Sequence, residues 1–177
     1  MKTPQATWKE IRVKLSKNSP RDLLGLIGDL YALRKENKNF LDARFVKGTH
    51  VLEPYKALIK KNICPEFPHP IKTSVARKAI SDYKKAIGYP HDLAELMIYY
   101  VECGVQFTLS YGDIDEPFYS SLESMFQQAV RFIKGCDKSI IEEFLPRLQT
   151  IVYMTRGTGW GFHDFLADVL KKDFPVL

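Results

Sequence analysis

Carboxylates gather around one turn of this 177-residue chain. Asp113, Asp115 and Glu116 follow Tyr111 closely, and Glu102 precedes them on the same predicted helix. Such an oxygen-rich group could hold a divalent cation or a cationic ligand. The spacing, however, lacks the length and glycine placement of a calcium loop, and capping of the next helix alone would explain acids at its positive end. A ligand groove and a structural cap are therefore alternatives, and no residue is assigned as a metal ligand.

A second polar turn carries glycines at every other position. Gly157, Gly159 and Gly161 stand between an arginine and a histidine, ahead of a predicted helix. Glycines in this place can expose backbone N–H groups to a phosphate. The spacing is GxGxG rather than GxGxxG and no Walker lysine follows, which disfavours nucleotide binding, so no cofactor is predicted. The alternative is a sharp turn between helices, with Trp160 and Phe162 packed into the core.

The adjacent His163 and Asp164 suggest a general base held by a carboxylate. Neighbouring helix residues point in different directions, however, and no nucleophile is tied to the histidine, which disfavours catalysis. The sequence instead predicts that Arg156 or His163 pairs with Glu102, Asp113 or Asp115, in a buried network that orders both turns. The candidate ligand-binding or structural network comprises Glu102, Tyr111, Asp113, Asp115, Glu116, Arg156, His163 and Asp164.

The net charge of +5 conceals two opposed halves. Residues 1–89 contain 19 Lys and Arg against 8 Asp and Glu, whereas residues 90–177 contain 7 against 13. Opposed halves can attract each other within one molecule or head to tail between molecules, and the basic half can attract polyanions. A solvated basic face is the alternative to nucleic-acid binding. The candidate polyanion-binding residues, expected on one helix, are Lys72, Arg77, Lys78, Lys84 and Lys85.

Apolar residues recur at helical spacing along the whole chain, and no strand alternation is evident. The sequence predicts an all-α fold of about eight or nine helices, arranged as an irregular bundle or as a short stack of helical hairpins, although no repeat of fixed period is present. A helix over 91–110 is apolar nearly all round and is expected to be central. Its polar exceptions form one narrow stripe, namely Glu95, Tyr99, Glu102, Gln106 and Ser110. A second helix is expected to face a core through Leu23, Leu24, Ile27, Leu30 and Tyr31.

The chain is expected to be one helical domain over 1–177, with lobes at 1–63 and 71–177 separated by a proline-rich stretch. Cys64, Cys103 and Cys136 are odd in number and lack CxxC spacing, which is typical of reduced thiols. No secretory signal is evident at the N-terminus, and charges interrupt the longest apolar run, so no membrane span is predicted. These features indicate a cytoplasmic protein.

Three runs resemble the signature stretches of a bacterial family of small all-helical proteins catalogued only as a domain of unknown function. They read YYVECGVQF (99–107), YGDIDEPFYSSLESMF (111–126) and TRGTGWGFHD (155–164). The resemblance implies a cytoplasmic bacterial protein and supplies no activity, cofactor or catalytic residue. The sequence favours a non-enzymatic binding or interaction module that takes a protein partner or associates with itself. Nucleic-acid binding through the basic half and a metal-dependent enzyme are the alternatives.

Overall fold

The computed structural model describes residues 6–45, 52–66 and 69–175. Within these ranges the chain forms nine helices and no strand, which confirms the all-α prediction. The helices are α1 (Trp8–Leu15), α2 (Pro20–Leu33), α3 (Lys35–Phe45), α4 (Glu53–Ile63), α5 (Thr73–Ala86), α6 (Pro90–Tyr111), α7 (Glu116–Lys134), α8 (Lys138–Met154) and α9 (Phe162–Asp173). The sequence also predicts that the third helix ends at Lys47 and Gly48, and these two residues lie outside the described ranges.

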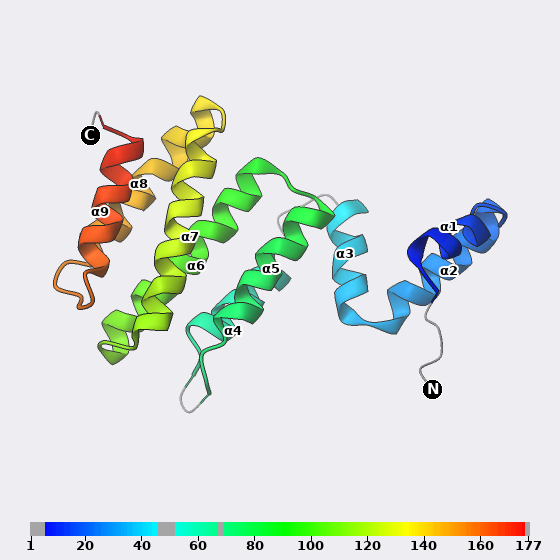
Figure 1. Cartoon of the computed structure of the whole chain (residues 1–177), viewed down its shortest axis with the longest axis horizontal. Coiled ribbons are helices and arrows are strands. Elements are labelled where there is room, and N and C mark those ends of the chain that lie inside the picture. Colours follow the sequence, from blue (N-terminus) through cyan, green and yellow to red (C-terminus); the bar gives the residue numbers. More distant parts are fainter. Residues whose placement is uncertain (1–5, 46–51, 67–68, 176–177) are drawn as a thin grey trace.

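Helices α4 to α9 form a stack of three helical hairpins, α4–α5, α6–α7 and α8–α9 (Figure 1). Helices α4, α6 and α8 are successive neighbours in one layer, and α7 packs against α9 in the other. Of the two predicted arrangements, the stack of hairpins matches these contacts. The three hairpins differ in helix length. This difference explains why the sequence shows no repeat of fixed period although hairpins are stacked in the structure.

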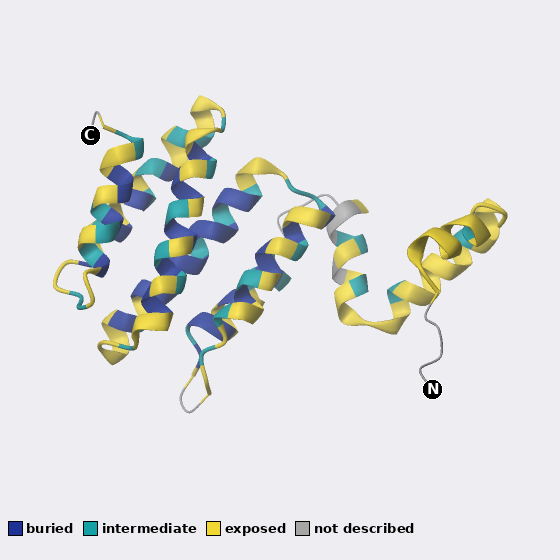
Figure 2. Cartoon of the chain, in the orientation of Figure 1, coloured by how far each residue is buried: buried dark blue, intermediate teal, exposed yellow. Residues whose placement is uncertain are grey.

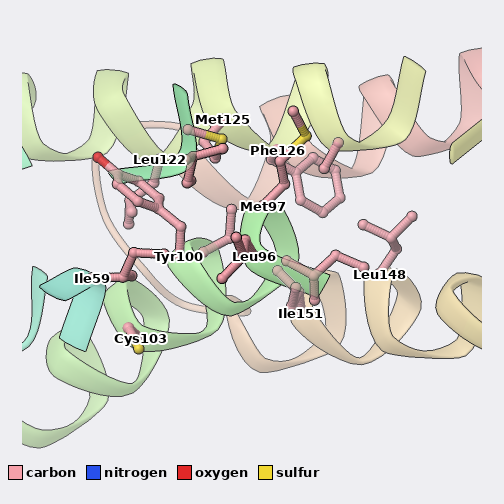
Figure 3. Packing of buried hydrophobic residues seen from close by; sticks show 14 of the residues in the cluster. Ile59, Leu96, Met97, Tyr100, Cys103, Leu122, Met125, Phe126, Leu148 and Ile151 are labelled. Carbon is pink, nitrogen blue, oxygen red and sulfur yellow. The ribbon is translucent and has the colours of Figure 1, made fainter. Parts of the chain in front are cut away.

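Helix α6 is the centre of the core, as its apolar composition predicts. Leu96, Met97 and Tyr100 on α6 are buried and lie between the side chains of α7 on one side and those of α8 on the other (Figure 3). The partners are Leu122, Met125 and Phe126 on α7, with Leu148 and Ile151 on α8. A helix that contacts both layers must be apolar on several faces, which explains the composition of 91–110.

Helices α1 and α2 are formed by local signals rather than by burial. In α1 the Thr7 hydroxyl accepts from the backbone N–H of Glu10, and the Glu10 carboxylate accepts from that of Thr7. Ser19 and Asp22 make the same capping box for α2, with a proline in its first turn. Reciprocal caps of this kind satisfy N–H groups that the helix leaves free. Both helices are therefore well specified by their own sequence.

The prediction that α2 faces a core is wrong. Neither α1 nor α2 has a buried residue, and Leu24, Ile27 and Leu30 are 70%, 43% and 45% exposed. The pair stands at the end of the molecule away from α9, joined to the stack through α3, which packs on α5 (Figures 1 and 2). Helical periodicity reveals an apolar face but does not show that the same chain covers it.

The described residues include no helix with the length and apolar character needed to span a bilayer. The proline-rich stretch after α4 leads into α5, and these two helices pack against each other as the first hairpin of the stack. Cys64, Cys103 and Cys136 are free thiols.

Candidate functional site

The two polar turns meet at Asp113. Its Oδ1 accepts a hydrogen bond from the Tyr119 hydroxyl at 2.9 Å and from the backbone N–H of Gly159 at 3.4 Å. A Cβ on Gly159 would lie only 2.7 Å from Asp113 Oδ2, so a larger residue there would displace this carboxylate. Asp115 caps α7 by accepting from the Phe118 N–H at 2.9 Å. The α6–α7 turn therefore docks on the α8–α9 turn through a carboxylate and a backbone N–H.

The predicted pairings of Arg156 and His163 with carboxylates are wrong, because each of these groups has another partner. His163 Nδ1 lies 3.0 Å from the Val152 carbonyl oxygen; a carbonyl only accepts, so this ring nitrogen carries the proton and donates. The Arg156 guanidinium stacks 4.7 Å from the centre of the Tyr153 ring. Glu102 is held by an arginine of α8 instead, as described below. Tyr111 stacks on a neighbouring phenylalanine ring of α6, and Glu116 and Asp164 are exposed.

Trp160 contradicts the expectation that it fills the core. Phe162 is fully buried, but Trp160 is 59% exposed. Its φ of +63° places a bulky side chain in the left-handed region, alongside Gly157 and Gly161 at +82° and +67°. A non-glycine residue in this region carries strain of about 1 kcal/mol or more. The turn thus presents a strained tryptophan to solvent.

Arg147 of α8 is the centre of a charge network that sequence reasoning missed. Its Nε and Nη2 donate to the two carboxylate oxygens of Glu102 at 2.9 and 2.7 Å, and its Nη1 donates to Glu95. The other oxygen of Glu95 lies 2.6 Å from the ammonium of Lys56 on α4, which also sits 5.2 Å above the Tyr99 ring. The predicted polar stripe of α6 is therefore the line along which α4 and α8 are attached to α6.

The network changes the acidity of its own members. Burial alone would raise the pKa of Glu95, but hydrogen bonds from Arg147 and Lys56 outweigh it and hold that pKa below its usual range. For Arg147, burial opposes the charged form, whereas the hydrogen bonds to Glu102 and Glu95 raise its pKa. The spacing of α8 could have identified Arg147. It stands three residues after the buried Phe144 and directly before the buried Leu148, so an arginine occurs on the buried side of the helix.

Beyond the network, a groove with a volume of about 370 Å³ opens between α4, α6 and α8. Its walls are mainly apolar and also include Lys60 and Glu102. Two thiols face it, but burial raises the pKa of Cys103 to about 11 and also raises that of Cys64. Both thiols are therefore protonated at neutral pH and are poor nucleophiles. No cluster of three potential metal ligands occurs within the described ranges.

Some of the basic residues predicted on one helix contact other side chains or backbone, and others are exposed to solvent. On α5, Arg77 donates to the Ser121 carbonyl oxygen at 3.1 Å and to the Ser124 hydroxyl at 3.2 Å, and Lys78 pairs with Asp82. The side chains left exposed, without an ion pair to any described residue, are those of Lys72, Lys84 and Lys85. Arg77 thus helps to attach α5 to α7.

Helices α1 and α2 expose several large apolar side chains. We call this surface the hairpin surface and define it by eight exposed apolar side chains, namely Trp8, Ile11, Val13, Leu24, Leu26, Ile27, Leu30 and Leu33. Trp8, Leu24 and Leu33 are each more than two-thirds exposed, at 68%, 70% and 69%. Residues 8–35 also contain seven Lys and Arg against three Asp and Glu, a net charge of +4. This surface combines apolar side chains with a surrounding positive charge.

Comparison with protein-family models, with curated proteins and with solved structures finds no match for this chain. The resemblance of its three signature runs to a bacterial domain family therefore stays a prediction. A function has to be inferred from the surfaces and side-chain contacts described above.

Proposed function

We propose that this protein is a non-enzymatic interaction module that docks onto another protein surface through the hairpin surface. One observation carries the proposal: two well-capped helices expose eight large apolar side chains and bury none. Exposed apolar side chains in such number on two neighbouring helices are typical of an interaction site, because burying one such side chain contributes about 1.5–3 kcal/mol. The helices are formed in advance, so little backbone ordering opposes docking.

Two glycines of α2 add support for a close contact. Gly25 and Gly28 lie inside the helix, where each costs about 0.5–1 kcal/mol relative to alanine. A Cβ added at either position would meet nothing within 4 Å. No contact with a described residue therefore requires glycine there. A partner backbone approaching α2 on the side of Leu24 would account for both glycines. The positive charge around the surface favours a partner with acidic residues.

The polar network proposed from the sequence is assigned a structural role. Asp113 accepts from Tyr119 and Gly159, Asp115 caps α7, and His163 is bonded to Val152. These contacts lie within the two turns and their helices, where they hold the turns together.

The test compares Leu24→Glu with Val75→Glu, a matched change of an exposed apolar residue on α5 that is 40% exposed. We expect proteins captured by tagged wild type to be retained by Val75→Glu and lost by Leu24→Glu, because the carboxylate cannot be buried in an apolar contact. Hydrogen exchange on the recovered complex should show slower exchange at α1 and α2. Unchanged capture by Leu24→Glu would exclude the hairpin surface as the docking site.

Nucleic-acid binding is the second candidate, favoured by the exposed ammonium groups of Lys72, Lys84 and Lys85, which form no ion pair with a described residue. If they contact phosphates, the affinity for single- or double-stranded nucleic acid should fall steeply with salt, and replacing all three by glutamine should reduce the salt slope by about three. Lys138→Gln, at a lysine that is 86% exposed on α8, is the control. A fluorescence-anisotropy titration at low salt checks this, and no binding there would remove the candidate.

A further inference from the structure

We infer that the partner docked on the hairpin surface is a second copy of this chain, which presents its two joined turns in a head-to-tail contact. The inference rests on the proposed function and names its partner. The turn surface is defined by Tyr111, Asp113, Asp115, Glu116 and Trp160. Its carboxylates are opposite in charge to the basic residues around the hairpin surface. Its exposed aromatic side chains can pack against the apolar side chains there.

The turn surface is a single surface because Asp113 joins its two parts. The bond from Gly159 N–H to Asp113 Oδ1 brings the α6–α7 turn against the α8–α9 turn. Tyr111 stands two residues before this contact and Trp160 stands one residue after it, and they are 58% and 59% exposed. Two large aromatic side chains therefore lie close in sequence to the hydrogen bond that joins the two turns. Aromatic anchors of this kind contribute strongly at protein interfaces.

Trp160 is the feature that folding of one chain does not explain. Glycine or asparagine would occupy its left-handed backbone conformation at lower cost, and its ring gains little burial in return. A bulky residue is retained in such a conformation where the surroundings use it, and an interface that buries the indole would supply this use.

Charge complementarity selects a second copy as the partner. Residues 109–116 contain three carboxylates and no Lys or Arg, a net charge of −3, against +4 for residues 8–35. The Asp113, Asp115 and Glu116 side chains are exposed. Attraction between such surfaces accelerates association and weakens as salt screens it. Two hairpin surfaces brought face to face would instead place like charges together.

The two surfaces lie far apart on one molecule. Helices α1 and α2 stand at one end of the chain, whereas the α6–α7 and α8–α9 turns lie toward the other end (Figure 1). A single copy therefore cannot cover its own hairpin surface with its own turns in this arrangement. A contact between unlike surfaces leaves one of each free on a pair, so a third copy can add.

Sedimentation velocity on the full chain tests the inference with two blocked variants. Leu24→Glu blocks the hairpin surface, and Trp160→Asn blocks the turn surface while tolerating the left-handed backbone. We expect the mass of wild type to rise with concentration and to fall with added salt. Each variant alone should associate about tenfold or more weakly, whereas an equimolar mixture should form one-to-one heterodimers and nothing larger. Circular dichroism verifies that both variants keep their helices.

Three outcomes would overturn this inference, and they can be told apart from a failure of the proposed function. A wild type that is monomeric at every concentration overturns the second-copy partner, and so does dimerisation that Leu24→Glu abolishes but Trp160→Asn leaves intact. Neither result affects the proposed function, which is tested separately by capture of other proteins with Leu24→Glu. Failure of the mixture to recover heterodimers would also overturn the head-to-tail arrangement. Val75→Glu, which changes neither surface, should behave as wild type.

Discussion

Arg147→Ala is expected to lower the free energy of unfolding by about 2–3 kcal/mol, because it leaves two carboxylates of α6 without their main partner. Glu95 has a side chain only 14% exposed and would retain Lys56 alone, while Glu102 would lose both of its hydrogen bonds to the guanidinium. Removing one member of a fully buried pair costs more, and the 32% exposure of the Arg147 side chain reduces the effect through solvent screening.

Urea denaturation measures this loss, and two further variants identify its cause. Arg147→Lys keeps the charge but cannot reach both carboxylates with a planar fork, so we expect it to recover only part of the stability. Lys138→Ala is the matched control on the same helix, because its pair with Glu142 is 86% and 64% exposed and should contribute less than about 0.5 kcal/mol. Equal losses of unfolding free energy for Arg147→Ala and Lys138→Ala would show that the network contributes no more to stability than an exposed ion pair.

The effect of Arg147→Ala should depend on pH in one direction. The pKa of Glu95 in the folded protein lies below the usual value of 4.5. A group whose pKa is lowered by folding contributes stability that is present above its unfolded pKa and is lost as the pH falls through its folded pKa. The difference in unfolding free energy between wild type and Arg147→Ala should therefore be largest near neutral pH and shrink below 4.5. A difference that stays constant into that acidic range would contradict the assigned role of Glu95.

The sequence was sufficient to find the polar stripe of α6 but not its partners. Glu95, Tyr99 and Glu102 recur at helical spacing on an otherwise apolar helix, and that local pattern shows that a polar contact must lie along one line. Which residues supply it depends on which helices flank α6. The stacking of hairpins decides which helices these are. Lys56 lies 39 residues before Glu95, and Arg147 lies 45 residues after Glu102.

The failures at α2 and Trp160 share a cause, which is that burial depends on the whole fold. The spacing of Leu24 and Ile27 correctly predicted a helix with an apolar face, but whether another helix covers that face is settled by tertiary contacts. Likewise Phe162 and Trp160 lie two residues apart in one glycine turn, where the left-handed conformation of Trp160 directs its side chain to solvent. Capping of α7 by an acid was predicted better, because Asp115 acts within its own turn.

Gly104→Ala is expected to lower the free energy of unfolding by about 1–3 kcal/mol, the usual cost of adding a methyl group to a filled core. An added Cβ would lie within 3.0 Å of three side-chain atoms of Leu122 on α7. Alanine is favoured over glycine in helices by about 1 kcal/mol, so a net loss would show that packing outweighs propensity. Gly25→Ala is the matched control, since its Cβ would meet nothing within 4 Å and the change should be neutral or stabilising.

A second change distinguishes crowding from other causes. Leu122→Ala alone should cost about 2–5 kcal/mol by leaving a cavity against α6. In the double variant the Gly104→Ala methyl group occupies part of that cavity, so the combined loss in denaturant unfolding should be smaller than the sum by about 0.5–3 kcal/mol. Strict additivity would mean that the two residues do not press on each other. A loss of stability with Gly104→Ala and none with Gly25→Ala would show that the α6–α7 contact is already filled within one chain, whereas the surface of α2 at Gly25 has room for a partner.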